Sequence, residues 1–60
     1  MKYYRLDRHF IDNEGYVQTK IIREYRSFDA AVHDYYGYTI MANKHEWFEI
    51  IEITERVIAP

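Results

Sequence analysis

Apolar and polar residues alternate along residues 3–11, YYRLDRHFI. Alternation with a period of two predicts a β-strand with one buried face. The next four residues, DNEG at 12–15, are turn formers, and Gly15 can adopt a positive φ. A second alternating segment at 16–26, YVQTKIIREYR, completes a predicted β-hairpin. The residues on the apolar side of the first segment are Tyr4, Leu6 and Phe10.

The turn also predicts how the two strands of this hairpin are aligned. A four-residue loop at 12–15 would place Phe10 opposite Val17 and Leu6 opposite Ile21. We favour this register because it puts the apolar residues of both strands on one face of the sheet.

Residues 27–37 have the pattern of one short helix. Ser27 is a good N-cap, and Asp29 lies in the first turn, where its charge complements the helix dipole. Gly37 is the expected C-terminal stop. The apolar stripe recurs with helical spacing and consists of Phe28, Ala31, Val32, Tyr35 and Tyr36.

The last segment, EWFEIIEITERVI at 46–58, is open to two interpretations. Asn43 and Glu46 can form a capping box for a helix. Six β-branched residues argue for a strand instead, and a hairpin covered by one helix needs a third strand to be stable. We therefore predict a strand. The six residues are Ile50, Ile51, Ile53, Thr54, Val57 and Ile58.

These elements give an α+β fold with the order β-β-α-β in a single domain over residues 1–60. We expect a small three-stranded antiparallel sheet with one helix packed on one face. The segment YTIM at 38–41 is a candidate for a short fourth strand.

Composition limits the class of protein. The 60 residues include no cysteine, and the formal net charge is −2, which gives no long-range attraction to nucleic acid or to an anionic membrane. No apolar run approaches the roughly 18 residues of a membrane span, and the start MKYYRLD lacks the apolar core of a signal peptide. We expect a cytoplasmic protein. A domain this small, without disulfides, commonly self-associates, and we predict a homodimer.

No residue pattern indicates catalysis. His9, His33 and His45 lack the spacing of a metal site, and Ser27 is already explained as a cap. Two glycines are too few for a phosphate-binding loop. We therefore expect neither an enzyme nor a bound metal or cofactor.

The hairpin offers one alternative function, because it combines basic and aromatic side chains that can contact nucleic acid. Nearby acidic residues offset this charge, so a small nucleic-acid-binding regulator is the second hypothesis. The residues concerned are Arg5, Arg8, Lys20, Arg23 and Arg26, with Tyr3, Tyr16 and Tyr25.

Aromatic and acidic residues gather around the end of the predicted helix. The chain has seven Tyr, three Phe and one Trp, and 60 residues cannot bury all of these rings. Tyrosine and tryptophan supply large, rigid contact area at protein interfaces. We expect the surplus to form a contact surface for another protein.

Four short features resemble the short bacteriophage inhibitors of uracil-DNA glycosylase over residues 4–57. In chain order they are the turn DNEG, Glu24–Tyr25 ending the second strand, Tyr36–Gly37 closing the helix, and Glu49–Ile51 opening the last strand. The resemblance implies a homodimer whose two helices grip a DNA-intercalating loop of the enzyme, while acidic groups replace phosphates. Position by position, Glu24 and Tyr36 match contact residues.

A similar layout, with Phe48–Glu49 in a strand and Ala59–Pro60 at the end, also resembles a phage inhibitor of host RNA polymerase. Anti-CRISPR and other anti-defence proteins have a similar size and general layout. We therefore predict a non-enzymatic inhibitor, encoded by a phage, that occupies the nucleic-acid-binding surface of a host enzyme. The candidate partner-binding residues are Glu24, Asp34, Tyr35, Tyr36 and Tyr38.

Overall fold

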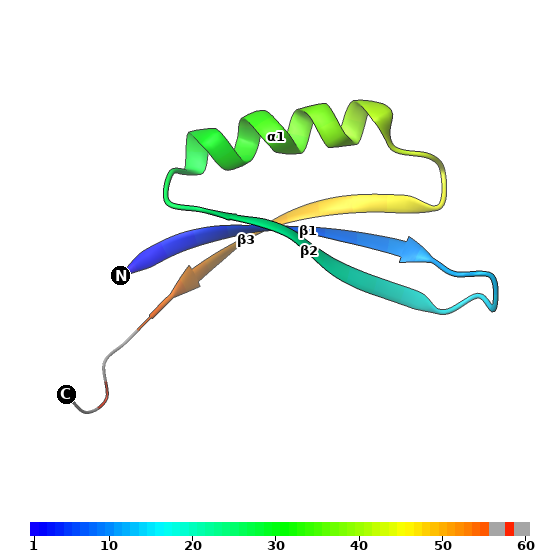
Figure 1. Cartoon of the computed structure of the whole chain (residues 1–60), viewed down its shortest axis with the longest axis horizontal. Coiled ribbons are helices and arrows are strands. Elements are labelled where there is room, and N and C mark those ends of the chain that lie inside the picture. The colour runs from blue at the N-terminus through cyan, green and yellow to red at the C-terminus, as the bar shows by residue number, and fades with distance from the viewer. Residues whose placement is uncertain (56–57, 59–60) are drawn as a thin grey trace.

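A β-hairpin, a helix and a third strand follow one another in the computed structural model, which describes residues 1–55 and 58. The strands form one antiparallel sheet in the order β2-β1-β3, and α1 lies along one face of it (Figure 1). The predicted α+β fold and its β-β-α-β order are confirmed. The elements are β1 Lys2–Ile11, β2 Val17–Tyr25, α1 Phe28–Met41 and β3 Glu46–Thr54.

The helix begins as predicted and ends later than predicted. The Ser27 side chain accepts a hydrogen bond from the Ala30 N–H at 3.4 Å, as expected of an N-cap. Gly37 does not stop the helix, because Tyr38 continues the sheet-facing side of α1 with its ring 5.2 Å from that of Phe48. The predicted fourth strand at 38–41 is therefore wrong.

The hairpin register differs from the prediction. The loop has five residues, Asp12–Tyr16, so that Ile11 pairs with Val17, and Phe10 lies opposite Gln18. The Asp12 carboxylate accepts hydrogen bonds from the N–H groups of Glu14 and Tyr16, both at 2.9 Å. These bonds draw Tyr16 into the turn and shift the pairing by one residue.

A β-bulge shifts the register again between Leu6 and Asp7. Leu6 lies opposite Arg23 and Asp7 opposite Ile21, so Ile22 is the extra residue of β2. The predicted Leu6–Ile21 pair is therefore wrong. Directly opposite residues share a face of a sheet, so Ile21 lies on the face of Asp7 and away from Leu6.

Beyond the bulge, the end of β2 faces the helix. Tyr25 lies opposite Tyr4 on β1, and the Tyr4 ring is 5.3 Å from that of Phe28 at the start of α1. The buried apolar core between the two layers is small and, among the described residues, consists of Leu6, Ala31 and Phe48.

The last segment is a strand, as predicted. Asn43 and Glu46 form one bond of the capping box, since the Asn43 N–H donates to Glu46 Oε1 at 3.1 Å, whereas the Asn43 side chain accepts from the His45 N–H at 2.8 Å and the Glu46 N–H donates to the Asn43 backbone carbonyl at 3.3 Å. This local motif holds the turn before β3 and starts no helix. β3 ends at Thr54, and residues 56, 57, 59 and 60, part of the predicted strand or of the AP ending, lie outside the described residues.

Candidate protein-binding surface

Asp34, the acidic candidate on the helix, ties α1 to the sheet. The Tyr25 hydroxyl donates a hydrogen bond to Asp34 Oδ2 at 2.6 Å. Burial, reinforced by this bond, raises the pKa of Tyr25 to about 12. The same bond, helped by the neighbouring His33 side chain, holds the pKa of Asp34 below its usual value. Asp34 thus has a structural partner already.

The three candidate tyrosines of α1 have different surroundings. Tyr35 is half-buried, and Tyr38 lies against Phe48 with part of its ring exposed. Tyr36 is 61% exposed and meets the Tyr35 ring edge-on at 5.6 Å. The apolar stripe predicted for the helix is therefore not buried at Tyr36, which points to solvent and is available to a partner, nor at Phe28, which is 52% exposed.

The C-terminal half of α1 exposes more apolar surface than the sequence indicated. Ile40 is 82% exposed, and Met41 is exposed to a similar degree. The sequence pattern makes both residues candidates for a short strand and therefore does not place them on the helix with Tyr36. We call this area the helix-end surface, and it consists of Tyr36, Tyr38, Ile40 and Met41.

A hollow of ≈ 280 Å³ lies beside the helix-end surface. A Cβ atom added at Gly37 would meet nothing within 4 Å, so the missing side chain of this residue leaves space on the helix. The hollow can receive an apolar side chain from another protein. It is lined by His33, Asp34, Gly37, Tyr38 and Met41.

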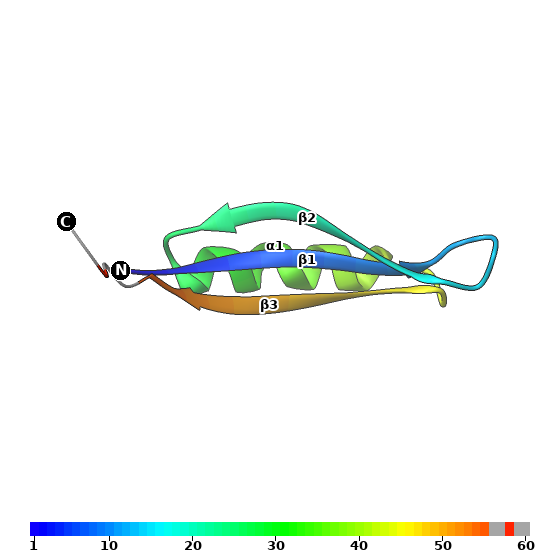
Figure 2. The same ribbon diagram turned by 90° about the horizontal axis from the view of Figure 1, so that it is seen from below.

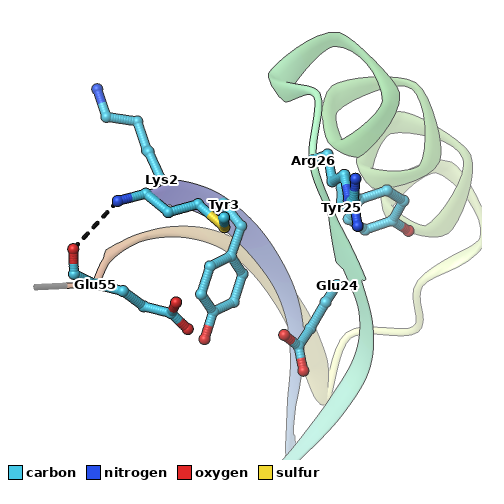
Figure 3. Close-up of a pocket in the computed structure, with 7 residues that line it drawn as sticks. Lys2, Tyr3, Glu24, Tyr25, Arg26 and Glu55 are labelled. Carbon is cyan, nitrogen blue, oxygen red and sulfur yellow. Dashed lines mark hydrogen bonds between the residues drawn. The ribbon is translucent and has the colours of Figure 1, made fainter. Parts of the chain in front are cut away.

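Glu24, the fifth candidate, lies apart from the other four. It lies between Arg23 and Tyr25 on β2, and Figure 3 shows its carboxylate turned away from the helix, on the side of Tyr3. It borders an open hollow of ≈ 490 Å³ where the first and last described parts of the chain meet. The charges around this hollow are mixed and include Lys2, Arg26, Glu24 and Glu55.

The acidic side chains of β3 lie beside basic or imidazole side chains of β1. Glu46 accepts a hydrogen bond from Arg8 Nε at 2.7 Å, and this bond lowers the pKa of the carboxyl. Glu52 lies 3.3 Å from Lys2 Nζ, and Glu49 lies 3.5 Å from His9 Nε2. The positive charges of Lys2 and Arg8 offset two of these carboxylates, so the acidic side chains of β3 do not form a free acidic surface.

The basic side chains of the hairpin lie on both faces of the sheet. Arg5 forms two hydrogen bonds with Asp7, at 2.8 and 2.9 Å, on the face away from the helix. Arg8 lies over the Phe10 ring at 4.2 Å on the helix side, with Lys20 close to the same ring. By their pairing, Lys20 and Arg23 lie on the same side as Arg8, whose charge Glu46 offsets, and Arg5 lies on the other face.

The histidines lie apart from one another. His9 stacks on Trp47 at 5.5 Å and its Nδ1 lies 2.9 Å from Thr19 Oγ1, whereas His33 is exposed on α1 and His45 is in the turn before β3. Within residues 1–55 and 58, no three His, Asp or Glu side chains form a cluster that could hold a metal ion. The described helix, α1, is too short and too polar to cross a membrane.

Comparison with protein families, with curated proteins and with solved structures finds no match for this chain. The resemblance to phage inhibitors stays a prediction from short sequence features.

Proposed function

We propose that the protein is a small non-enzymatic domain that binds another protein through the helix-end surface. The observation that carries this proposal is the exposure of Tyr36, Ile40 and Met41 together on the last turns of one helix. Monomeric proteins rarely leave contiguous apolar surface of this kind uncovered. Tyrosine is also one of the residue types that dominate binding energy at interfaces.

The hollow beside Gly37 also provides the helix-end surface with a recess that one side chain can fill. A partner side chain placed there would touch Tyr38 and Met41 and approach Asp34, whose carboxylate remains partly exposed. The Tyr38 ring, which lines the hollow, would exclude water from the contact. Anchors of this type, in which one side chain fills a pocket rimmed by aromatic groups, carry most of the affinity of small interfaces.

We propose an inhibitor as the biological role, acting in the cytoplasm of a host cell by covering the working surface of an enzyme. The sequence resemblance supports a nucleic-acid enzyme as the target, with uracil-DNA glycosylase first and RNA polymerase or an anti-phage defence protein as alternatives. Because Glu46 and Glu52 are paired with Arg8 and Lys2 within the sheet, apolar contact carries more of this inhibition than phosphate mimicry.

Inhibition assays test the target. Purified uracil-DNA glycosylase and RNA polymerase are each assayed with the wild-type protein, with Tyr36→Ala and with Tyr16→Ala. Tyr16 is 65% exposed at the hairpin tip, so its variant is a matched loss of one exposed tyrosine. We expect wild type and Tyr16→Ala to inhibit one enzyme, and Tyr36→Ala to inhibit it poorly. If none of the three proteins inhibits either enzyme, these targets are wrong.

The second hypothesis, nucleic-acid binding by the hairpin, is tested by titration with single- and double-stranded DNA and RNA at two salt concentrations. Micromolar affinity that falls steeply with salt would favour it. The division of Arg5 and Arg8 between opposite faces of the sheet argues for weak binding.

A further inference from the structure

The face of the sheet opposite α1 is uncovered in the described part of the chain. Figure 2 shows this face from below, with the three strands in front of the helix. Antiparallel sheets that face water normally carry polar residues on that side. Here seven apolar residues share it, by their pairing in the sheet. They are Tyr3, Ile11, Val17, Ile21, Trp47, Ile51 and Ile53.

The centre of this open sheet face is already dry. Asp7 is 1% exposed although no helix or strand among the described residues covers it, because side chains of the same face surround it. Its two hydrogen bonds from Arg5 neutralise its charge. A buried charge that is paired and hydrogen-bonded can be covered without leaving an unpaired ion.

The edges of the open sheet face are more polar. Glu49 lies on β3 and Glu24 on β2, both exposed and both on strands that border the sheet. A neutral, partly apolar centre bordered by charged side chains is the usual composition of a protein–protein interface.

The amount of uncovered surface indicates the size of the missing contact. A folded monomer of 7.4 kDa is expected to expose about 4,200 Å². This chain exposes 5113 Å². The surplus, about 900 Å² over the whole molecule, is large enough to include the roughly 800 Å² that each partner contributes to a standard interface.

We propose that a second copy of this chain covers the open sheet face, so that two sheets pack face to face between two outer helices. Apolar residues lie at both ends of the face, with Ile11, Val17 and Trp47 towards the hairpin and Tyr3, Ile51 and Ile53 at the other end. A two-fold axis through the middle therefore brings apolar ends together. Arg5 and Asp7 cancel each other, and Glu24 and Glu49, which lie opposite them on the two outer strands, stay at the edges of the contact. The helix-end surfaces stay outside this contact.

Trp47 is the one tryptophan of the chain, lies on this face and is 40% exposed, so its fluorescence reports the contact. Sedimentation equilibrium and Trp emission are measured over nanomolar to high micromolar concentrations. We expect a dimer at micromolar concentration, with emission shifting to shorter wavelength as it forms. Ile21→Lys should weaken dimerisation at least about 10-fold.

Ile40→Lys is the matched control, because it places the same charge on the helix-end surface. We expect it to leave dimerisation unchanged. Val17→Lys provides a second substitution on the open sheet face should Ile21→Lys fail to fold by circular dichroism. A monomer at high micromolar concentration would overturn the proposal. A dimer that both open-face variants leave intact, or that Ile40→Lys dissociates, would also overturn it, and would assign the contact to a strand edge or to the helix.

These outcomes are independent of the proposed function. A monomeric Ile21→Lys variant that still binds a partner protein would show that the two surfaces act separately. Loss of partner binding in Ile40→Lys, with the dimer intact, would support the helix-end surface alone.

Discussion

The hydroxyl of Tyr25, the last residue of β2, donates a 2.6 Å hydrogen bond to the carboxylate of Asp34 in the middle of α1. This bond joins residues nine positions apart and connects the edge strand of the sheet to the helix that carries the proposed binding surface. It uses one of the seven tyrosines for structure, whereas Tyr36, two residues beyond Asp34, is left for contact.

Alkaline pH should weaken this connection. The folded-state pKa of Tyr25 is raised to about 12 from an ordinary value of 10.0, so its contribution is fully present below pH 10 and is lost as pH rises towards 12. Unfolding in urea, followed at several pH values between 8 and 12, should show a falling free energy of unfolding. Tyr25→Phe should be less stable at neutral pH and should lose less stability over this range. An equal alkaline loss in both proteins would contradict the account.

Acid should destabilise the protein through three carboxyl groups. Hydrogen bonds lower the pKa values of Asp12, Asp34 and Glu46 in the folded state, chiefly from Gln18, Tyr25 and Arg8 respectively. Their contribution is present above the unfolded-state pKa of about 4 and is lost as pH falls through the folded values. We expect the free energy of unfolding to drop between pH 5 and pH 3, and Glu46→Gln to reduce that drop. A stability unchanged down to pH 3 would show that these bonds do not contribute.

Two neighbouring aromatic residues should differ in their effect on stability. Phe48 is buried between sheet and helix, so Phe48→Ala should lower the free energy of unfolding by about 3–5 kcal/mol. Trp47 lies on the open sheet face, so Trp47→Ala should cost about 1 kcal/mol when measured at concentrations where the protein is monomeric. Denaturant unfolding by far-ultraviolet circular dichroism distinguishes them. Equal losses would place both side chains in one core and contradict the alternation of β3.

Gly37→Ala should separate stability from binding. The Gly37 backbone is helical and its surroundings are open, so alanine should stabilise the protein by about 0.5–1 kcal/mol. The added methyl group also enters the hollow of the helix-end surface, and we expect weaker partner binding. Thermal unfolding and a binding titration report the two effects. A variant that is more stable and binds normally would remove the hollow from the proposed contact.

The sequence was sufficient for the elements and for several local signals. Strand alternation, the Ser27 cap and the β-branched residues of the last strand all act within a few residues, and the structure confirms each of them. The expectation that so short a chain cannot bury all eleven aromatic side chains is also met, since Tyr16, Tyr36 and Tyr38 are exposed.

Features that depend on contacts between elements were not predictable in the same way. In the sequence Gly37 resembles a helix stop, and only the contact between Tyr38 and Phe48 in the structure explains why the helix continues. The hairpin register depends on the side-chain bonds of Asp12, and the later shift depends on a bulge with no sequence signature of its own. Once the register had changed, Ile21 belonged to the open sheet face, and that surface was missed.

Affinity capture with matched tyrosine variants tests the central claim most directly. Tagged wild type, Tyr36→Ala and Tyr16→Ala, each shown to be folded, are incubated with a bacterial lysate, and the retained proteins are identified and quantified. The account predicts that the wild type and Tyr16→Ala retain the same partner and that Tyr36→Ala retains at least about 10-fold less of it. Equal retention of that partner by all three proteins, or its loss from Tyr16→Ala alone, would contradict binding through the helix-end surface.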